Sequence, residues 1–185
     1  GKKQTNDDGM TALQRTVMVA VTVAVAALAG TAHAAGGNDP CWLWRSVMPG
    51  TGAHFYFNLT AFVGEQAGQA TNDDDVLFNA NICNYTKKTH CGTHASVCLN
   101  IDGDYAHAGD FHSREARPLD GLRGMQLTMV GEDRCRRGGR FSTQFIFKCD
   151  SASSKTKYTC EYNDRACMLM CKVNSKHACY ILGDP

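Results

Sequence analysis

The sequence predicts an all-β domain, a sandwich or flattened barrel, that is made in the secretory pathway. Short segments of alternating apolar and polar residues recur between Gly-, Asn- and Asp-rich turns. Ten cysteines follow an N-terminal segment with the pattern of a secretory leader, which is typical of disulfide-bonded domains. At 185 residues, the chain has the length of one ordinary domain.

The N-terminus has the three parts of a signal peptide. After Met10 come the basic Arg15, an apolar stretch over residues 17–29 and the small-residue site Ala32-His33-Ala34. The apolar stretch is shorter than the ~20 residues of a membrane-spanning helix, so an uncleaved anchor is the weaker alternative. We therefore interpret residues 10–34 as a signal peptide cleaved after Ala34, residues 1–9 as upstream or added sequence, and residues 35–40 as a linker.

Six segments have the composition of β-strands. Gly103-Asp104 and Gly138-Gly139 are turn signals between them. Apart from the signal peptide, no window shows a long period of 3.6 residues, and no internal repeat is evident. The expected strands cover residues 55–59, 76–83, 95–101, 125–130, 141–149 and 167–173.

Composition excludes some functions. Hydrophobic residues make up 43% and charged residues 20%, as in globular domains, and the net charge is +1. A chain this close to neutral has no overall field that would attract nucleic acid. The one basic run, which contains Arg134, Arg136, Arg137 and Arg140, is interpreted as a solvated loop.

The sequence has no recognisable catalytic or metal centre. No G-x-S-x-G motif is present, and cysteines in an oxidising lumen are not nucleophiles, so we expect neither enzymatic activity nor a cofactor. His90, Cys91, His94 and Cys98 have a spacing that could hold zinc. An oxidising compartment favours a disulfide between the two cysteines instead, with the histidines in a loop.

A second group of polar residues contains His107, His112, Asp104 and Asp110, which we expect in a solvated loop. Histidine titrates in the endosomal pH range, so pH sensing by these residues is a further hypothesis. Glu132-Asp133 is interpreted as a structural turn.

Other residues indicate modification or packing. Asn58-Leu59-Thr60 and Asn84-Tyr85-Thr86 are acceptor motifs for N-glycosylation at Asn58 and Asn84. Trp42 and Trp44 follow Cys41 with alternating spacing, and we expect them to pack in the core or at its edge.

Six motifs occur in order over residues 41–179, with cysteines in register. Together they resemble the mannose-6-phosphate receptor homology family, in the pattern of its autophagy-related and cation-dependent receptor members. Gly121-Leu122, Leu127-Thr128 and residues 131–135 together look like the family's "GL…LTY…GD.C" stretch, and residues 141–150 look like its "RST.I.F.CD" strand. The other four matches are Phe57-Asn58-Leu59, Asn81-Ile82-Cys83, Cys91-Gly92-Thr93 with Val97-Cys98, and Cys167 with Ala178-Cys179.

The resemblance implies a flattened barrel of two orthogonal antiparallel sheets over residues 41–180, followed by a tail over 181–185. It also implies four disulfides, and the two remaining cysteines, Cys160 and Cys171, are expected to pair by arithmetic. The pairs implied by the family are Cys41–Cys83, Cys91–Cys98, Cys135–Cys167 and Cys149–Cys179.

Members of the family bind mannose through glutamine, arginine, glutamate and tyrosine side chains, which form hydrogen bonds with sugar hydroxyls. The glutamine and tyrosine positions hold Leu99 and Leu169. The arginine position holds Phe141, with Arg140 one residue earlier, and a shift of one residue in a strand changes the face. The glutamate corresponds loosely to Glu161, in a segment expected to be a loop. Binding of mannose by the usual site is therefore not expected.

Three functions remain open. The first is a non-catalytic luminal binding module of a sorting or trafficking receptor, whose partners are protein or glycoprotein cargo. The second is a lectin for N-glycans with a rearranged pocket built on Arg140 and Glu161, and the third is an accessory subunit of a luminal glycan-processing enzyme. We expect a location in the endoplasmic reticulum, Golgi or endosome lumen, or secretion, with membrane attachment only if a transmembrane segment follows Pro185.

Overall fold

The computed structural model describes residues 43–47, 52, 54–87 and 89–182. The chain divides into two units, Gly1–Thr31 and Ala32–Pro185, and every described residue belongs to the second. The signal peptide with its cleavage site at Ala34, the linker, Cys41 and Trp42 lie outside the described residues.

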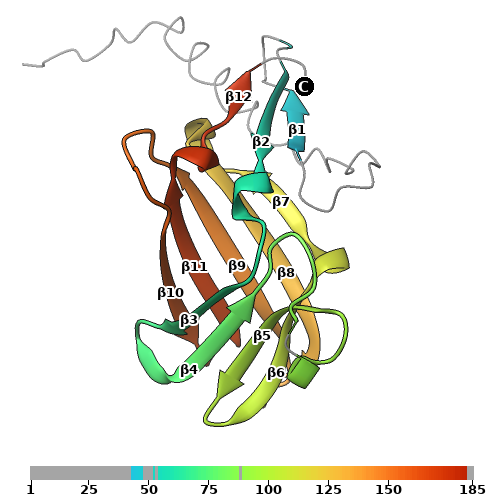
Figure 1. The fold of residues 1–185 in the computed structure, drawn as a ribbon. Coiled ribbons are helices and arrows are strands. Elements are labelled where there is room, and N and C mark those ends of the chain that lie inside the picture. Colours follow the sequence, from blue (N-terminus) through green and yellow to red (C-terminus); the bar gives the residue numbers. More distant parts are fainter. Residues whose placement is uncertain (1–42, 48–51, 53, 88, 183–185) are drawn as a thin grey trace, which may run out of the picture. The chain divides into compact units, whose positions relative to one another are not determined.

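The strands of the described part form three sheets (Figure 1). A five-stranded sheet has the order β10-β11-β9-β8-β7, a four-stranded sheet the order β3-β4-β5-β6, and a small sheet the order β1-β2-β12. The bounds are β1 Leu43–Val47, β2 His54–Asn58, β3 Gln66–Ala70, β4 Asp73–Ala80, β5 Ala95–Ile101, β6 Asp104–Asp110, β7 Glu115–Pro118, β8 Gly124–Arg134, β9 Arg140–Cys149, β10 Lys157–Asn163, β11 Met168–Ser175 and β12 Ile181–Leu182.

Short 3-10 turns connect some of the strands. They are η2 Leu59–Phe62, η3 Thr89–Cys91, η4 Phe111–Ser113, η5 Asp120–Leu122 and η6 Lys176–Ala178. Among the described residues, none of the helical segments has the length and hydrophobicity needed to cross a bilayer.

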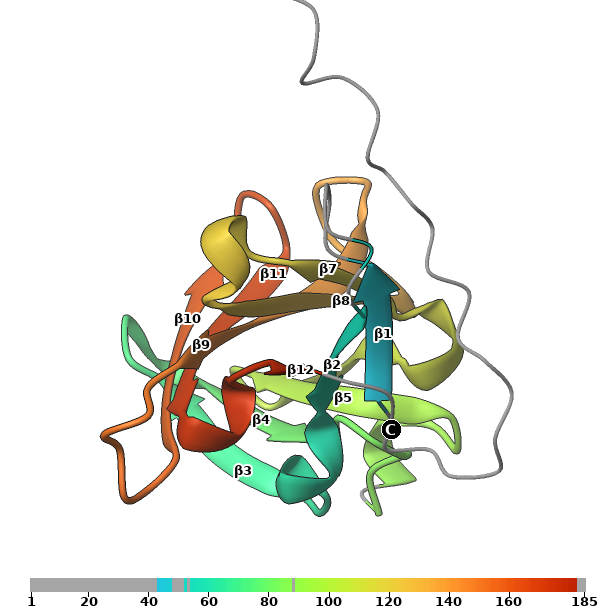
Figure 2. The same ribbon diagram turned by 90° about the horizontal axis from the view of Figure 1, so that it is seen from above.

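The two larger sheets pack face to face, and their strands cross steeply (Figures 1 and 2). Strand β6 contacts β8 and β9 along one side, and β10 contacts β3 and β4 along the other, so the sheets are joined at both edges. This is the flattened β-barrel that the sequence predicts.

Alternation along the strands places the apolar side chains between the sheets. Phe145 and Phe147 of β9 are 1% and 0% exposed, and the ring of Phe147 lies 4.9 Å from that of Phe62. Burying a side chain of this size stabilises the fold by about 1.5–3 kcal/mol relative to leaving it exposed. The largest of the other fully buried side chains are Phe55, Phe57, Ile82, Leu99, Met125, Met129, Leu169, Val76 and Val97.

One detail of the predicted sheets is corrected by the structure, because β9 and β11 run parallel, with Met168 opposite Ser142. Strand β11 lies between β9 and β10, and its inner face, which includes Leu169 and Val173, is buried. Strand β10 is the last strand of this sheet, and its outer edge is covered by the β3–β4 turn, where the N–H of Thr71 donates to the carbonyl of Cys160 at 2.7 Å.

Two segments expected to be loops are strands. Asp104–Asp110 forms β6, which pairs with β5, and Glu161 lies within β10 opposite Met170. The composition of β6, rich in Asp, Ala and Gly, hides the strand because these residues have low β propensity. Asp102 and Gly103 both have positive φ angles, 53° and 92°, and make the two-residue turn that joins β5 to β6.

The small third sheet was not expected. In it, Ile181 and Leu182 pair with Tyr56 and Phe55 of β2, so part of the predicted tail continues the fold.

The disulfides of the described part follow the expected pattern. The structure joins Cys91 to Cys98, Cys135 to Cys167, Cys149 to Cys179 and Cys160 to Cys171. Cys83 is also disulfide-bonded, and its expected partner Cys41 lies outside the described residues. Loops of this size stabilise a fold by roughly 2–4 kcal/mol per bridge when they are closed.

Candidate functional site

Of the three positions that the sequence resemblance assigns to sugar ligands, two lie in the interior of the barrel and the third lies against it. Leu99 of β5 and Leu169 of β11 are both 0% exposed and belong to one apolar cluster between the sheets. Phe141 of β9 is half-buried and packs against the same cluster. These side chains offer no hydrogen bonds to a sugar, and no solvent reaches the two leucines.

Arg140 lies on the opposite face of β9 from Phe141. Thr143, Phe145 and Phe147 are buried, so odd positions of this strand face the core and even positions face outward. The irregularity in pairing falls between Val130 and Arg134 on the neighbouring strand β8 and does not turn Arg140 inward. Arg140 is exposed at the first position of the strand.

Glu161 also faces outward, from β10, and lies near Lys172 with 3.9 Å between Oε1 and Nζ. It pairs with Met170, which pairs with Gln144 of β9. Arg140 precedes Gln144 by four residues, so at ~3.3 Å per residue and ~4.8 Å per strand the Cα atoms of Arg140 and Glu161 are roughly 16 Å apart. The structure does not bring these two residues together around one sugar ring.

Glu161 instead lines a polar surface hollow of about 460 Å³ near the β10–β11 turn. Arg137 closes one side, with its Nη2 and Nε donating to Oδ2 of Asp164 at 3.2 and 3.4 Å. The Cys135–Cys167 disulfide ties the turn that carries Arg137 to the turn that carries Asp164. The ion pair and the disulfide therefore hold one wall of the hollow in place, and the carboxylate of Glu161 can accept hydrogen bonds from a ligand.

Below this hollow, Asn72 fixes the backbone of β10. Its amide donates to the carbonyl of Tyr162 and its carbonyl accepts from the N–H of Tyr162, both at 2.8 Å. Burial raises the pKa of the Tyr162 phenol, and the nearby charges of Asp164 and Asp73 raise it further. The phenol therefore stays neutral at any physiological pH.

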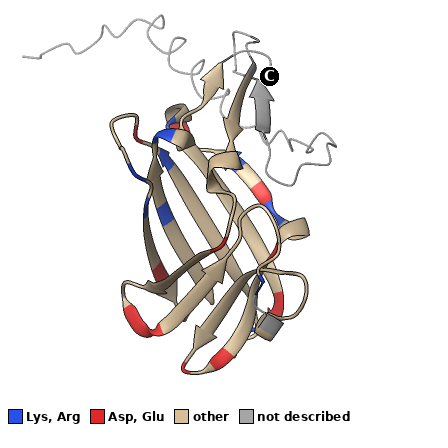
Figure 3. Ribbon diagram, in the orientation of Figure 1, with Lys and Arg blue, Asp and Glu red and all other residues tan. Residues whose placement is uncertain are grey.

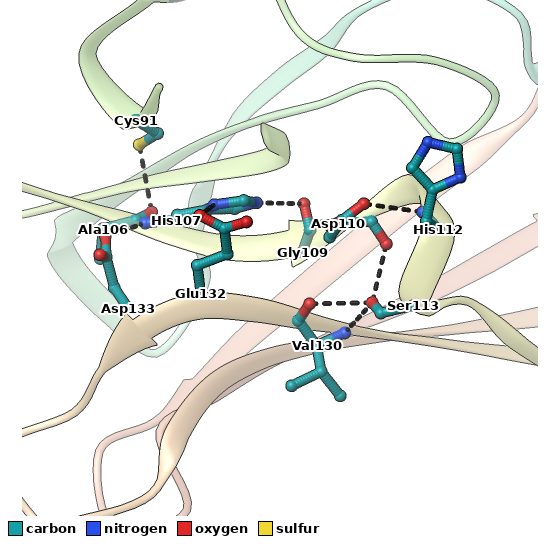
Figure 4. Close-up of polar contacts among 10 residues, drawn as sticks. All are labelled: Cys91, Ala106, His107, Gly109, Asp110, His112, Ser113, Val130, Glu132 and Asp133. Atoms are coloured by element: carbon teal, nitrogen blue, oxygen red, sulfur yellow. Dashed lines mark hydrogen bonds and ion pairs between the residues drawn. The ribbon is translucent and has the colours of Figure 1, made fainter. Parts of the chain in front are cut away.

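A second polar cluster joins β6 to β8 (Figure 4). The backbone N–H of His107 donates to Oδ2 of Asp133 at 2.7 Å, and Nε2 of His107 lies 3.1 Å from the carbonyl oxygen of Gly109. Nδ1 of His107 faces Glu132 at 3.8 Å. His107 is 4% exposed, which corrects the expectation of a solvated loop residue.

The same seam, where β6 and β8 lie against each other, explains why residue 131 is a glycine. A Cβ atom at this residue would overlap the carbonyl oxygen of His107, so the β8 backbone approaches β6 more closely than any side chain permits. Gly131 and Asp133 therefore have a structural role at the closure of the barrel. They and Glu132 lie within β8, so the turn expected at Glu132-Asp133 is wrong.

Tyr85 organises an aromatic group at the surface. Its hydroxyl lies 2.7 Å from Nε2 of His112, and its ring makes edge contacts with His94 and Phe111. The guanidinium of Arg114 lies 3.7 Å above the Phe111 ring. The edge contacts and the cation–π contact order this loop without converging on a shared cavity.

The residues weighed for zinc are arranged differently from a metal site. Cys91 and Cys98 form a disulfide, and His90 stacks on Tyr105 with 4.5 Å between ring centroids. Within the described ranges 43–47, 52, 54–87 and 89–182, no three His, Cys, Asp or Glu side chains converge on a position for a metal ion.

Charge is spread over the surface (Figure 3). Two residues of the basic run are exposed partners of acidic groups, since Arg136 lies 3.6 Å from Asp104 and Arg137 lies 3.2 Å from Asp164. The other two, Arg134 and Arg140, are exposed and lie opposite each other in the β8–β9 register. Acidic residues gather at one end of the four-stranded sheet (Figure 3), where β4 begins with Asp73, Asp74 and Asp75 and the β5–β6 turn carries Asp102.

The two glycosylation motifs have different surroundings. Asn58 is half-buried at the end of β2, where its Oδ1 accepts a hydrogen bond from the N–H of Thr60 at 2.9 Å. Asn84 is exposed, whereas Thr86 of its motif is 8% exposed and donates its hydroxyl to the carbonyl of Ala95.

Known structures share this fold. Domain 11 of chicken IGF2R superposes with a TM-score of 0.56 and 21% identity, covering 73% of this chain and 90% of that domain. Domain 11 of the echidna mannose-6-phosphate/IGF2R receptor gives a TM-score of 0.53 and 19% identity, covering 73% and 93%. No family model and no curated protein matches the sequence. The predicted resemblance to mannose-6-phosphate receptor homology domains is thus confirmed at the level of the fold.

Proposed function

We propose that this protein is a non-catalytic binding module of the secretory-pathway lumen, which recognises protein or glycoprotein cargo without the usual mannose site. The single observation that supports the proposal is the burial of Leu99 and Leu169 in the core. The sequence resemblance assigns these two positions to the mannose-binding glutamine and tyrosine. Phe141 packs against the same core at the position of the arginine. The fold of the receptor domains and the disulfides support a luminal or secreted location.

The energetics favour loss of sugar binding. Each missing hydrogen-bonding partner costs about 1–3 kcal/mol, and three replaced ligands would remove most of the affinity of a monosaccharide site. Forming a sugar pocket between the two sheets would in addition expose Leu99 and Leu169 to solvent. We therefore expect binding through surface side chains, in a sorting or trafficking receptor.

A glycan array tests the proposal directly. The secreted domain, with its disulfides intact, is applied to high-mannose, phosphomannosyl and complex N-glycans. We expect no mannose-dependent signal. We also expect cargo that is identified by crosslinking in the lumen of expressing cells to bind the purified domain without crosslinker, equally well before and after the cargo is deglycosylated. Mannose-specific binding that free mannose displaces would overturn the proposal.

A lectin with a rearranged pocket is the second candidate, and the polar hollow that contains Glu161 favours it. In that case Glu161→Gln abolishes glycan binding. The Cα atoms of Arg140 and Glu161 are roughly 16 Å apart on the outer face of the five-stranded sheet. Arg140→Ala therefore serves as the matched control and leaves glycan binding unchanged.

A further inference from the structure

Asn58 stands at the edge of a surface hollow where β2 passes into η2. Its Oδ1 accepts hydrogen bonds from the backbone N–H and the hydroxyl of Thr60, so the side chain has a fixed direction. The Nδ2 atom of the same amide is the atom that carries a glycan in an N-glycosylated protein.

The hollow has a volume of about 380 Å³ and lies between η2 and the segment η6–β12, which contact each other. Asn58 lines one side, and Lys176, His177, Tyr180 and Ile181 line the other. A volume near the lower end of the range for small-molecule sites suits one or two sugar rings.

The lining has the two kinds of surface that a sugar ring uses. Tyr180 is 37% exposed and Ile181 is 42% exposed, and both present apolar surface for the C–H face of a pyranose. Lys176 and His177 supply donors for hydroxyl and N-acetyl oxygens. Tyr180 is held in place by an edge contact with Phe55, with ring centroids 6.3 Å apart.

We propose that this hollow is the seat of the first N-acetylglucosamine of a glycan attached to Asn58. The sugar is tethered to the rim of its own site, so its effective concentration is high and a few weak contacts suffice to hold it. The glycan then covers Tyr180 and Ile181 and joins η2 to the C-terminal strand. This inference rests on passage through a glycosylating lumen and is independent of the cargo that the domain binds.

Asn84 provides the matched control. It lines neither of the two hollows described above, and its neighbour Tyr85 turns its ring towards His94, Phe111 and His112. We therefore expect a glycan at Asn84 to extend into solvent and to contribute little to stability.

The test compares thermal unfolding of protein secreted from eukaryotic cells, with site occupancy measured by mass spectrometry. One sample is trimmed enzymatically to a single N-acetylglucosamine at each site. The reference is Asn58→Asp, which keeps an oxygen acceptor for the N–H of Thr60 but carries no glycan. We expect the trimmed protein to melt about 3 °C above the Asn58→Asp variant, and Asn84→Asp to change the Tm by less than about 1 °C.

A double-mutant cycle separates docking from a general effect of glycosylation. Tyr180→Ala lowers the Tm of the trimmed glycoprotein by more than it lowers the Tm of Asn58→Asp, because only the former loses a sugar contact. Equal losses in both backgrounds, or an unoccupied Asn58, overturn the proposal. A failed glycan array leaves this measurement unaffected, so the two proposals fail separately.

Discussion

Strand β11 shows the contrast between the two faces of the five-stranded sheet. Leu169, Cys171 and Val173 point into the barrel and are each 0% exposed, whereas Met170 and Lys172 alternate with them on the outer face and reach solvent. The inner face at Leu169 belongs to a closed apolar core, whereas the outer face carries Glu161 and Arg140. The difference teaches that β11 stabilises the barrel through one face and leaves the other face of the sheet accessible to a partner.

The largest effect should follow from a change on the inner face. Leu169→Ala removes a fully buried side chain from a closed core and should lower the free energy of unfolding by about 2–5 kcal/mol. Denaturation by urea, followed by far-ultraviolet circular dichroism, measures the loss. Met170→Ala, on the outer face of the same strand, is the control and should lose much less. Equal losses would show that the interior of the barrel is not closed at Leu169.

A substitution in the seam between β6 and β8 should have the next largest effect on the free energy of unfolding. Asp133→Ala leaves the buried N–H of His107 without its carboxylate acceptor, which should cost about 1–3 kcal/mol of stability. The matched control is Glu132→Ala, since the Glu132 side chain is 70% exposed and should contribute no more than about 0.5 kcal/mol. If both variants unfold at the same urea concentration, Asp133 does not hold the seam.

A smaller effect on stability should come from Tyr162 of β10 at alkaline pH. The pKa of Tyr162 is raised in the folded state, so the unfolded chain ionises first as the pH rises above about 10. The stability linked to this phenol is fully present below that pH and is lost as the pH rises towards the folded-state pKa. Tyr162→Phe should therefore flatten the fall of the Tm between about pH 9 and 11, in comparison with the wild-type chain. A parallel fall in both proteins would contradict this expectation.

The smallest effects on stability are expected from substitutions on the outer face of the five-stranded sheet. Arg140→Ala and Glu161→Ala each remove an exposed side chain and should change the free energy of unfolding by less than about 0.5 kcal/mol. Urea denaturation of both variants checks this. A loss above about 1 kcal/mol at either position would show that the outer face is covered in the folded protein, contrary to the described exposure.

Sequence reasoning recovered the strands whose apolar residues alternate strongly, such as β5 and β9, and the disulfides of the described part. It missed β6, because a strand of Asp, Ala, His and Gly owes its place to the close approach of Gly131 and the acceptor Asp133, which are distant in sequence. The alternation of Tyr158, Cys160 and Tyr162 would have revealed β10, but the family resemblance places Glu161 in a loop. The parallel pairing of β9 and β11 has no local signal, since pairing order depends on tertiary packing.

The apolar character of Leu99, Phe141 and Leu169 could be read from the sequence, but their depth in the core could not. Likewise, the motif at Asn58 is visible in the chain, whereas the hollow beside it forms only when η2 meets η6. Sites built from one segment are open to prediction, and sites built where two distant segments meet need the structure.

Strand β11 pairs between β9 and β10 although it is made after both, and this order has a consequence for biosynthesis. Strand β9 can complete its hydrogen bonds only after residue 175 has been made, and β2 gains its partner β12 only after residue 182. Such pairing between segments distant in the sequence forms more slowly than the consecutive strand pairs of β3 to β6. During that interval, we expect enzymes that rearrange disulfides to reach Cys171 of β11, which the finished barrel buries.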